Sequence, residues 1–378
     1  MYNNPQQIVR EIEMVKRILL MIGITALPVL TVAGENLTLE KKIGQMLMVG
    51  FHGISAPKNS QICKDIQTYN LGSVILFDFN PVDKSKPKNI ANRSQLKKLT
   101  SQLQACSADG KLLIAVDQEG GKVQRLKSKY GFYGKFPKAS DVIKMDQSKI
   151  KATYTKMSRE LKSVGINYDL APVVDLDINM KNHVIHGLGR SFGKDPKTVA
   201  KYASTFIDAM HSNGVLTSIK HFPGHGSSVG DTHKGFVDVT NLWQEVELEP
   251  YKLLKDKADT VMVAHVFNKK LDAKYPASLS YKTITKMLRW KLGYHGAVIT
   301  DDLQMGAISK KYGLKNTLKL AINAGDDILL IGNQLDPRKV KSTKTLVDTI
   351  RALVKSGEVK EESINKAYKR VQILKKKL

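Results

Sequence analysis

Eight short apolar runs recur along the chain, and amphipathic stretches with apolar residues at helical spacing separate them. The runs are MLMVGF (46–51), SVILF (73–77), LLIAV (112–116), INYDLAP (166–172), LTSIK (216–220), TVMVAH (260–265), GAVIT (296–300) and DILLIG (327–332). Glycines end several of the amphipathic stretches, as is common at helix C-termini. Strands that alternate with helices, without hairpin turns, favour a parallel sheet, and eight is the number that closes a (β/α)8 barrel.

We therefore predict an α/β fold, a single (β/α)8 TIM-type barrel over residues 35–378 with two extra C-terminal helices within residues 336–378. The chain has 378 residues, of which 42% are hydrophobic and 25% charged, as in a globular protein with a substantial core. No low-complexity linker marks a second large domain. A doubly wound open sheet is the alternative, but the GxGxxG turn of dinucleotide-binding sheets does not follow the first strand.

The N-terminal residues match the three regions of a secretory signal peptide. Lys16 and Arg17 precede the apolar run ILLMIGITALPVLTVAG, which ends in small residues and is short for a membrane span. We expect residues 1–34 to be a signal peptide or an N-terminal anchor, and the protein to be exported to the periplasm or cell envelope. A buried first helix is the other interpretation, and the protein would be cytoplasmic if the run is not a signal.

The chain carries a formal net charge of +25, mostly from lysines spread along its length. This charge indicates either a solvated basic surface or attraction to a polyanion such as an acidic envelope polymer. The sequence has no zinc finger, no RNA-binding aromatic signature and no basic dimerisation helix, so we do not expect a nucleic-acid partner.

Cys63 and Cys106 are the two cysteines of the chain, and each falls within a predicted helix. Two cysteines are too few for a disulfide framework, and neither has the CxxC or CxxH spacing of a redox or metal motif. Two buried or half-buried thiols are therefore predicted in preference to a single disulfide.

Polar residues follow the predicted strands, where barrel enzymes carry their reactive groups. Asp301 and Asp302 come directly after GAVIT, and Asp301 could be a nucleophile or general base, or either residue could cap a following helix. Asp117 follows LLIAV, and Arg125 lies eight residues further on. A carboxylate that accepts from two hydroxyls, beside a donating guanidinium, can hold a small polyol; a structural ion pair is the alternative.

The stretch SIKHFPGHGSSVGDTHKG contains His221, His225 and His233. These histidines lack the HExxH spacing and an accompanying cysteine pair, so we predict no metal site, and the stretch does not fit the phosphate-binding GxxxxGK[ST] pattern. Asp231 and His233 lie two residues apart, which in an extended segment puts both side chains on one side. The carboxylate can then fix the imidazole tautomer, and the dyad can donate and accept a proton. A surface pair or a loop histidine with satisfied hydrogen bonds are the alternatives.

Together these stretches resemble glycoside hydrolase family 3, and within it the single-domain β-N-acetylglucosaminidases. The matching motifs occur in the family's order over roughly residues 38–335, namely VDQEGGKVQR, DLAPVVDLD, GRSFGKDP, KHFPGHGSSVGDTH, AHV followed by PASLS, and ITDDLQM. The resemblance implies a retaining hydrolase that removes terminal, non-reducing β-linked N-acetylglucosamine. It also implies a peptidoglycan fragment as substrate, with the sugar joined to N-acetylmuramic acid or its anhydro form.

The resemblance also implies roles for individual residues. Asp301 would be the nucleophile, His233 the general acid/base and Asp231 the group that polarises it. The sugar would be held by Asp117, Arg125, Arg190, Lys220 and His221. Asp302 and His225 would be structural, a cap and a loop brace. This departs from the usual glycosidase pair of carboxylates, and the dyad would replace the acid that two-domain relatives take from a second domain.

We expect a carbohydrate substrate, no cofactor and a monomeric protein, with a basic surface that could favour anionic envelope polymers. Other activities of the same family are the alternatives: a β-glucosidase, a β-xylosidase or an N-acetylglucosaminide phosphorylase. Phosphorolysis stays open because a neutral histidine repels an anionic attacking group less than a carboxylate does. An inactive sugar-binding protein of the cell wall is the alternative that is not an enzyme.

Overall fold

The computed structural model describes residues 37–378, and Thr38–Leu378 form one compact unit. The predicted signal peptide or anchor, residues 1–34, lies outside the described residues. Between residues 37 and 378, no helix combines the length and apolar character needed to cross a membrane.

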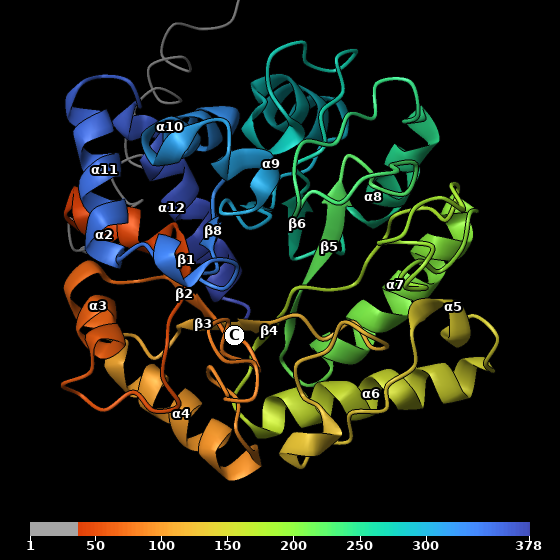
Figure 1. The fold of residues 1–378 in the computed structure, drawn as a ribbon, viewed down its shortest axis with the longest axis horizontal. Helices are drawn as coiled ribbons and strands as arrows, with labels where there is room; N and C mark the ends of the chain where they lie inside the picture. The colour runs from red at the N-terminus through yellow and green to blue at the C-terminus, as the bar shows by residue number, and fades with distance from the viewer. Residues whose placement is uncertain (1–36) are drawn as a thin grey trace, which may run out of the picture. The chain divides into compact units, whose positions relative to one another are not determined.

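Eight parallel strands form the barrel in the order β7-β6-β5-β4-β3-β2-β1-β8 (Figure 1). They are β1 (Leu47–Gly50), β2 (Ser73–Ile75), β3 (Leu113–Val116), β4 (Tyr168–Asp169), β5 (Leu216–Phe222), β6 (Thr260–Val263), β7 (Ala297–Thr300) and β8 (Leu329–Ile331). The barrel closes between β7 and β8, where the N–H of Thr300 donates to the carbonyl of Ile328 and the N–H of Ile328 donates to Val298, both at 3.0 Å. The predicted (β/α)8 barrel is confirmed.

Helices follow the strands and surround the barrel (Figure 1). The α-helices are α2 (Leu39–Gln45), α3 (Gln61–Tyr69), α4 (Arg93–Cys106), α5 (Ala139–Val142), α6 (Gln147–Ser163), α7 (Pro196–His211), α8 (Glu249–Leu254), α9 (Gly306–Ser309), α10 (Gly313–Ala324), α11 (Thr343–Lys355) and α12 (Glu361–Lys375). The remaining helical segments are η1 (Ser128–Tyr130), η2 (Glu245–Leu248), η3 (Ala277–Leu279), the π-helix η4 (Lys282–Lys291) and η5 (Pro337–Lys339). Helices α11 and α12 are the two predicted C-terminal helices.

Local sequence explains where several helices begin. Helix α7 starts at Pro196 because the preceding Asp195 accepts the N–H of Thr198 at 2.7 Å, and proline at the first helical position loses no hydrogen bond. In α4, Asn92 accepts the N–H of Gln95 at 2.9 Å in the same way.

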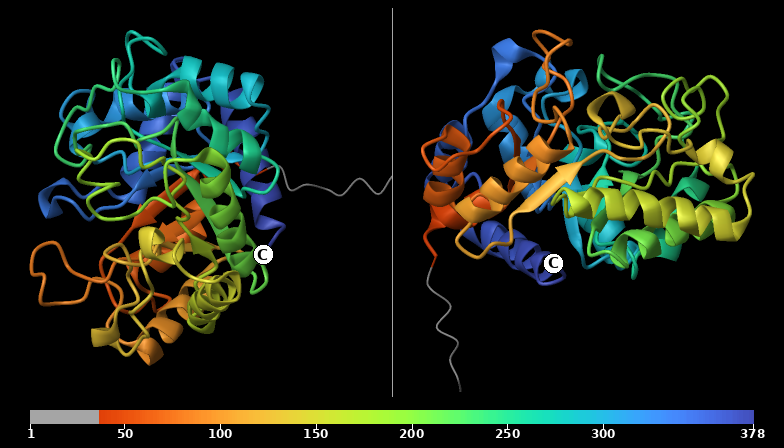
Figure 2. Two further views of the ribbon diagram at one scale, coloured as in Figure 1. Left: turned by 90° about the vertical axis from the view of Figure 1, so that its right-hand side faces the viewer. Right: turned by 90° about the horizontal axis from the view of Figure 1, so that it is seen from below.

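Helix α12 closes the amino-terminal end of the barrel. Its residues Val371 and Leu374 belong to the apolar cluster formed by inward-facing strand side chains such as Leu113 and Leu330. The helix is dark blue and leads to the C-terminus in Figure 2. Lys377, two residues beyond it, anchors this end, because its Nζ lies 2.8 Å from a carboxylate oxygen of Asp259. Since this end is filled, a ligand can enter the barrel only from the carboxyl ends of the strands.

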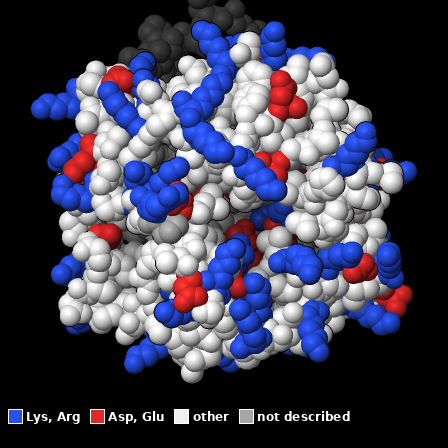
Figure 3. Space-filling model, viewed as in Figure 1, with Lys and Arg blue, Asp and Glu red and all other residues white. Residues whose placement is uncertain are grey.

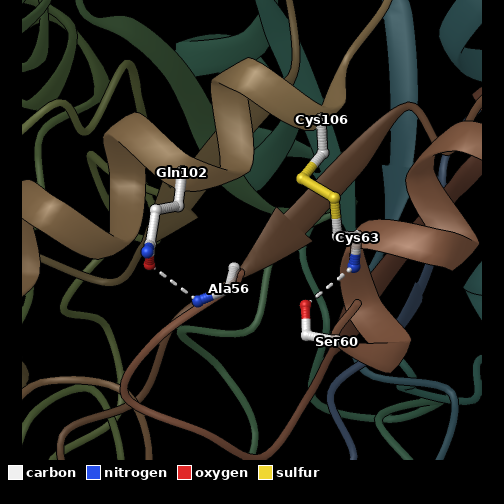
Figure 4. Close-up of a disulfide and its surroundings, with 5 residues drawn as sticks. All are labelled: Ala56, Ser60, Cys63, Gln102 and Cys106. Carbon is white, nitrogen blue, oxygen red and sulfur yellow. Dashed lines mark hydrogen bonds between the residues drawn. A yellow bond between two sulfur atoms is a disulfide. The ribbon is translucent and has the colours of Figure 1, made fainter. Parts of the chain in front are cut away.

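A disulfide bond joins Cys63 of α3 to Cys106 of α4 (Figure 4). The Cα atoms are 5.3 Å apart, within the range for a disulfide. The prediction of two separate thiols was therefore wrong. The two residues are 43 positions apart in the chain, and their pairing depends on how α3 packs against α4, which cysteine spacing does not reveal.

Candidate active site

A cavity of about 390 Å³ opens at the carboxyl ends of the strands. Apolar side chains in or directly after the strands form its floor: Ile75, Leu170, Met262 and Leu330. On the face drawn in Figure 3, a hollow near the centre contains both acidic and basic side chains. All eight residues that the sequence singled out for catalysis or sugar binding line this cavity, namely Asp117, Arg125, Arg190, Lys220, His221, Asp231, His233 and Asp301.

Asp117 follows β3 and lies between two cations. Its Oδ2 accepts a hydrogen bond from Arg125 at 3.1 Å, and its Oδ1 accepts one from the Nζ of Lys220 at 3.0 Å. Burial raises the pKa of Asp117, but the charges of Lys220 and Arg125 outweigh burial and hold this pKa below its usual value. Asp117 is therefore an ionised acceptor at neutral pH.

Glu119 is a site residue for which the sequence predicted no role. Its two carboxylate oxygens accept from the guanidinium of Arg190 at 2.7 and 2.8 Å, and Lys220 lies 2.7 Å from Oε1. These cations lower the pKa of Glu119 in spite of its burial. The signal was present in DQEGG, because Glu119 follows the same strand as Asp117 and lies two residues beyond it.

Lys220 and His221 lie near the carboxyl end of β5, and both line the cavity. Neighbouring side chains of a regular strand point to opposite faces, but here the register with β6 shifts between Lys220 and Phe222, which redirects them. The Nδ1 of His221 lies 2.6 Å from Oδ2 of Asp175, a buried residue of the DLAPVVDLD motif for which the sequence predicted no role in the site. This contact fixes the orientation of the imidazole ring.

His225 braces the loop after β5, as expected. Its Nδ1 lies 2.6 Å from the hydroxyl of Ser228, and its main-chain N–H donates to Asp175 at 2.8 Å. Burial lowers the pKa of His225 to about 4, so the ring is neutral at physiological pH. His225 therefore adds no charge to the cavity.

Asp301 and Asp302 follow β7 but differ in environment. Burial raises the pKa of Asp301, yet the nearby imidazoles of His265 and His221 outweigh this and lower it, which favours a carboxylate. Burial raises the pKa of Asp302 to about 6. The prediction that Asp302 caps a helix was wrong, because the next helix, α9, begins only at Gly306. Instead, Oδ1 of Asp302 accepts the N–H groups of Gln304 at 3.0 Å and of Gly332 at 3.2 Å. Asp302 thus braces the turn after β7 against the residue that follows β8.

Asp231 and His233 lie on the loop that follows β5. Oδ1 of Asp231 is 2.9 Å from Nδ1 of His233 and also accepts the main-chain N–H of His233 at 3.0 Å. The His233 side chain is 55% exposed, and within residues 37–378 its Nε2 has no hydrogen-bond partner. The loop is held in place because the carbonyl of His233 accepts the N–H of Gly306 at 3.2 Å. Nε2 is therefore free to meet a group in the cavity.

Among the described residues, no three histidine, cysteine, aspartate or glutamate side chains are grouped so that they could hold a metal ion. The cavity instead combines ionised carboxylates, fixed cations and imidazoles, which can bind hydroxyl groups and transfer protons.

The fold and the site thus define a (β/α)8-barrel protein with a polar, sugar-sized cavity at the carboxyl ends of its strands. The model of the "Glycosyl hydrolase family 3 N terminal domain" matches residues 38–374, and the chain belongs to this family.

Similar proteins include "Beta-hexosaminidase A" of Pseudoalteromonas piscicida, 30% identical, where the match covers 92% of this chain and 62% of that protein. "Beta-hexosaminidase LpqI" of Mycobacterium tuberculosis is 34% identical, over 70% of this chain and 68% of that protein. A solved family 3 beta-N-acetylglucosaminidase from Paenibacillus sp. has 33% identity and a TM-score of 0.80, with 90% of this chain and 62% of that chain covered. The chain thus spans about three fifths of the length of two of these relatives.

Proposed function

We propose that this protein is a retaining exo-β-N-acetylglucosaminidase. The observation that carries the proposal is that Asp301 and the Asp231–His233 dyad line the same cavity as a cluster of hydroxyl-binding charges. Family membership and the names of the similar proteins, beta-hexosaminidase and beta-N-acetylglucosaminidase, support the same activity.

The sugar is bound by the charged cluster on the β3 and β5 side of the cavity. Asp117, ionised and held between Lys220 and Arg125, accepts hydrogen bonds from sugar hydroxyls. Arg190, whose Nη2 lies 3.4 Å from Nε2 of His221, supplies further donors beside it. Because these groups are held by one another before the substrate arrives, little side-chain entropy is lost on binding.

In the first step, the carboxylate of Asp301 attacks the anomeric carbon while protonated His233 gives its Nε2 proton to the glycosidic oxygen. The bond from the anomeric carbon to that oxygen breaks, the aglycone leaves as an alcohol, and a covalent glycosyl ester forms on Asp301. Asp231 stabilises the imidazolium through its 2.9 Å contact with Nδ1. The lowered pKa of Asp301 keeps the nucleophile ionised at neutral pH.

In the second step, neutral His233 takes a proton from water, and the oxygen of that water attacks the anomeric carbon. The ester bond to Asp301 breaks, the carboxylate is restored and the sugar is released with its β configuration retained. His233 is protonated again, and the cycle is complete.

The natural substrate in this proposal is a peptidoglycan fragment in which N-acetylglucosamine is joined to N-acetylmuramic acid or its anhydro form. The protein acts in the periplasm or cell envelope, where the signal-like residues 1–34 would direct it. The Cys63–Cys106 disulfide supports this location, because disulfides persist in oxidising compartments and are rare in the cytosol.

One panel of assays tests the proposed function. The protein is given the nitrophenyl β-glycosides of N-acetylglucosamine, glucose and xylose, in buffer with and without phosphate, and the sugar products are analysed. We expect the N-acetylglucosaminide to be hydrolysed much faster than the other two and to yield free sugar even in phosphate. A glucoside or xyloside preference, a sugar phosphate product, or no turnover of any of the three contradicts the proposal.

A further inference from the structure

Asp78 is a buried carboxylate behind the charged cluster of the cavity, and the proposed mechanism does not use it. It lies three residues beyond β2, its side chain is 1% exposed, and it lies outside the set of residues that line the cavity. A buried carboxylate is costly unless cations pair with it. Two cations do so here: the Nζ of Lys127 is 2.6 Å from Oδ2, and Nη1 of Arg125 is 3.8 Å from Oδ1.

The guanidinium of Arg125 is divided between two carboxylates. Its Nη2 donates to Oδ2 of Asp117 at 3.1 Å, whereas its Nη1 faces Asp78. A guanidinium often binds a single carboxylate through two parallel hydrogen bonds. Because Asp78 attracts the second nitrogen, Arg125 donates one hydrogen bond to Asp117 instead of two. More of the lone pairs of Asp117 are thus left for the hydroxyl groups of a sugar.

The segment that carries Asp78 is fixed by several contacts. The hydroxyl of Tyr130 donates to the main-chain carbonyl of Asp78 at 2.8 Å. The preceding residue, Phe77, exchanges two hydrogen bonds with Asn89, both at 3.0 Å. Phe77 lines the cavity, and its ring centroid lies 5.4 Å from the guanidinium carbon of Arg125, within the range of a cation–π contact. Arg125 is therefore held by an aromatic ring and by a carboxylate from one fixed segment.

We propose that Asp78 is a positioning residue for sugar binding. It holds Arg125 in the orientation in which Asp117 receives one hydrogen bond from the guanidinium and accepts others from the sugar. Asp78 itself does not touch the sugar. This role rests on the proposed function, because it requires that Arg125 and Asp117 bind the sugar of the substrate.

The test measures kcat and KM for the nitrophenyl and methyl β-glycosides of N-acetylglucosamine. We expect Asp78→Asn to raise KM by about three- to tenfold for both substrates and to change kcat by less than about twofold. The physical reason is that a displaced Arg125 weakens the hold on the sugar, whereas Asp301 and His233 keep their positions. Thermal unfolding of each variant shows the temperature range in which the protein is folded, and the assays are made within it.

A second measurement separates positioning from a general effect on packing. Arg125→Lys should raise KM by itself, and the addition of Asp78→Asn should raise KM no further, because Asp78 acts through the guanidinium. Increases in KM that multiply in the double variant would show that Asp78 acts independently of Arg125 and would overturn its assigned role.

Lys127→Gln is the matched control. It breaks the 2.6 Å contact with the same carboxylate but leaves Arg125 beside Asp78, so KM should stay within about twofold of the wild-type value. The paired variant Asp78→Asn, Lys127→Gln leaves no lysine without its partner, and it should show the same rise in KM if Asp78→Asn alone does not fold.

An unchanged KM in the folded Asp78 variants, or an equal rise in KM in Lys127→Gln, would overturn the role of Asp78 and leave the proposed function intact. A wild-type protein that hydrolyses neither N-acetylglucosaminide overturns the proposed function, and the role of Asp78 with it.

Discussion

Asp231 holds His233 by two hydrogen bonds to the same carboxylate oxygen, one from the imidazole Nδ1 at 2.9 Å and one from the main-chain N–H at 3.0 Å. The two contacts fix both the ring and the backbone that carries it, and they leave Nε2 as the nitrogen that can face a ligand. A proton donor needs this arrangement, since the carboxylate selects the tautomer and stabilises the imidazolium.

If His233 is the acid, His233→Ala should depend strongly on the leaving group. For an alkyl N-acetylglucosaminide, kcat/KM should fall by about 10²- to 10⁴-fold, because the departing alkoxide is no longer protonated. For a dinitrophenyl N-acetylglucosaminide the leaving group needs no proton, so kcat/KM should change little. Asp231→Asn should show the same pattern with smaller losses. Equal losses of kcat/KM on both substrates in His233→Ala would refute the acid role.

Glu119 should matter for stability as much as for binding. Glu119→Gln removes the buried charge that pairs with Arg190 and Lys220, so the free energy of unfolding should fall by about 3–5 kcal/mol in urea titrations. The matched control is Glu245→Gln, which breaks an exposed pair with Lys291 and should have no measurable effect. Similar unfolding curves for the two variants would mean that the Glu119 cluster does not stabilise the fold.

The sequence predicted the barrel well because strand and helix patterns are local. The run GAVIT (296–300) became β7 at Ala297–Thr300, and LLIAV (112–116) became β3 at Leu113–Val116. The run at 166–172 was less accurate, since only Tyr168–Asp169 pair as β4. Beyond Asp169 the chain continues beside β5 with irregular pairing, including an isolated bridge between Val173 and Lys220, and a count of apolar residues does not detect this irregularity.

The partnerships between side chains could not be predicted in the same way. Glu119 meets Arg190, and Asp175 meets His221, only because neighbouring strands bring residues 71 and 46 positions apart together at the same end of the barrel. The motifs placed each of these residues at a strand end, but the pairing depends on strand register and on the shift in β5. The Asp302 brace was missed for the same reason, since its partner Gly332 follows a different strand.

Glu247 should make stability depend on pH. Burial raises its pKa from 4.5 to about 7, so the folded protein binds this proton more tightly than the unfolded chain does. The resulting stabilisation is fully present below pH 4.5 and is lost as the pH rises through about 7, by at most about 1.4 kcal/mol per pH unit.

Glu247→Gln removes this titration. The melting temperature of the variant minus that of the wild type should therefore increase between pH 4.5 and 7 and stay constant above that window. Thermal unfolding followed by circular dichroism at several pH values measures the difference. A difference that is independent of pH, or that decreases over this window, contradicts the assigned pKa shift.

The disulfide should stabilise the fold by linking α3 to α4. For a closed loop of 43 residues, the double variant Cys63→Ala, Cys106→Ala should lower the free energy of unfolding by about 4 kcal/mol. A reducing agent should lower the melting temperature of the wild type and have no effect on the variant. Equal sensitivity of both proteins to the reductant would show that the bond does not stabilise the fold.

In the proposed mechanism Asp301 becomes covalently attached to the sugar, and trapping this intermediate tests that step. The protein is incubated with a 5-fluoro N-acetylglucosaminyl fluoride, which slows release of the sugar, and is then digested and analysed by mass spectrometry. We expect one added sugar, attached to the peptide that contains Asp301, and no adduct in Asp301→Asn. An adduct on another residue, or an Asp301→Asn variant that still turns over substrate at a near-normal rate, would contradict it.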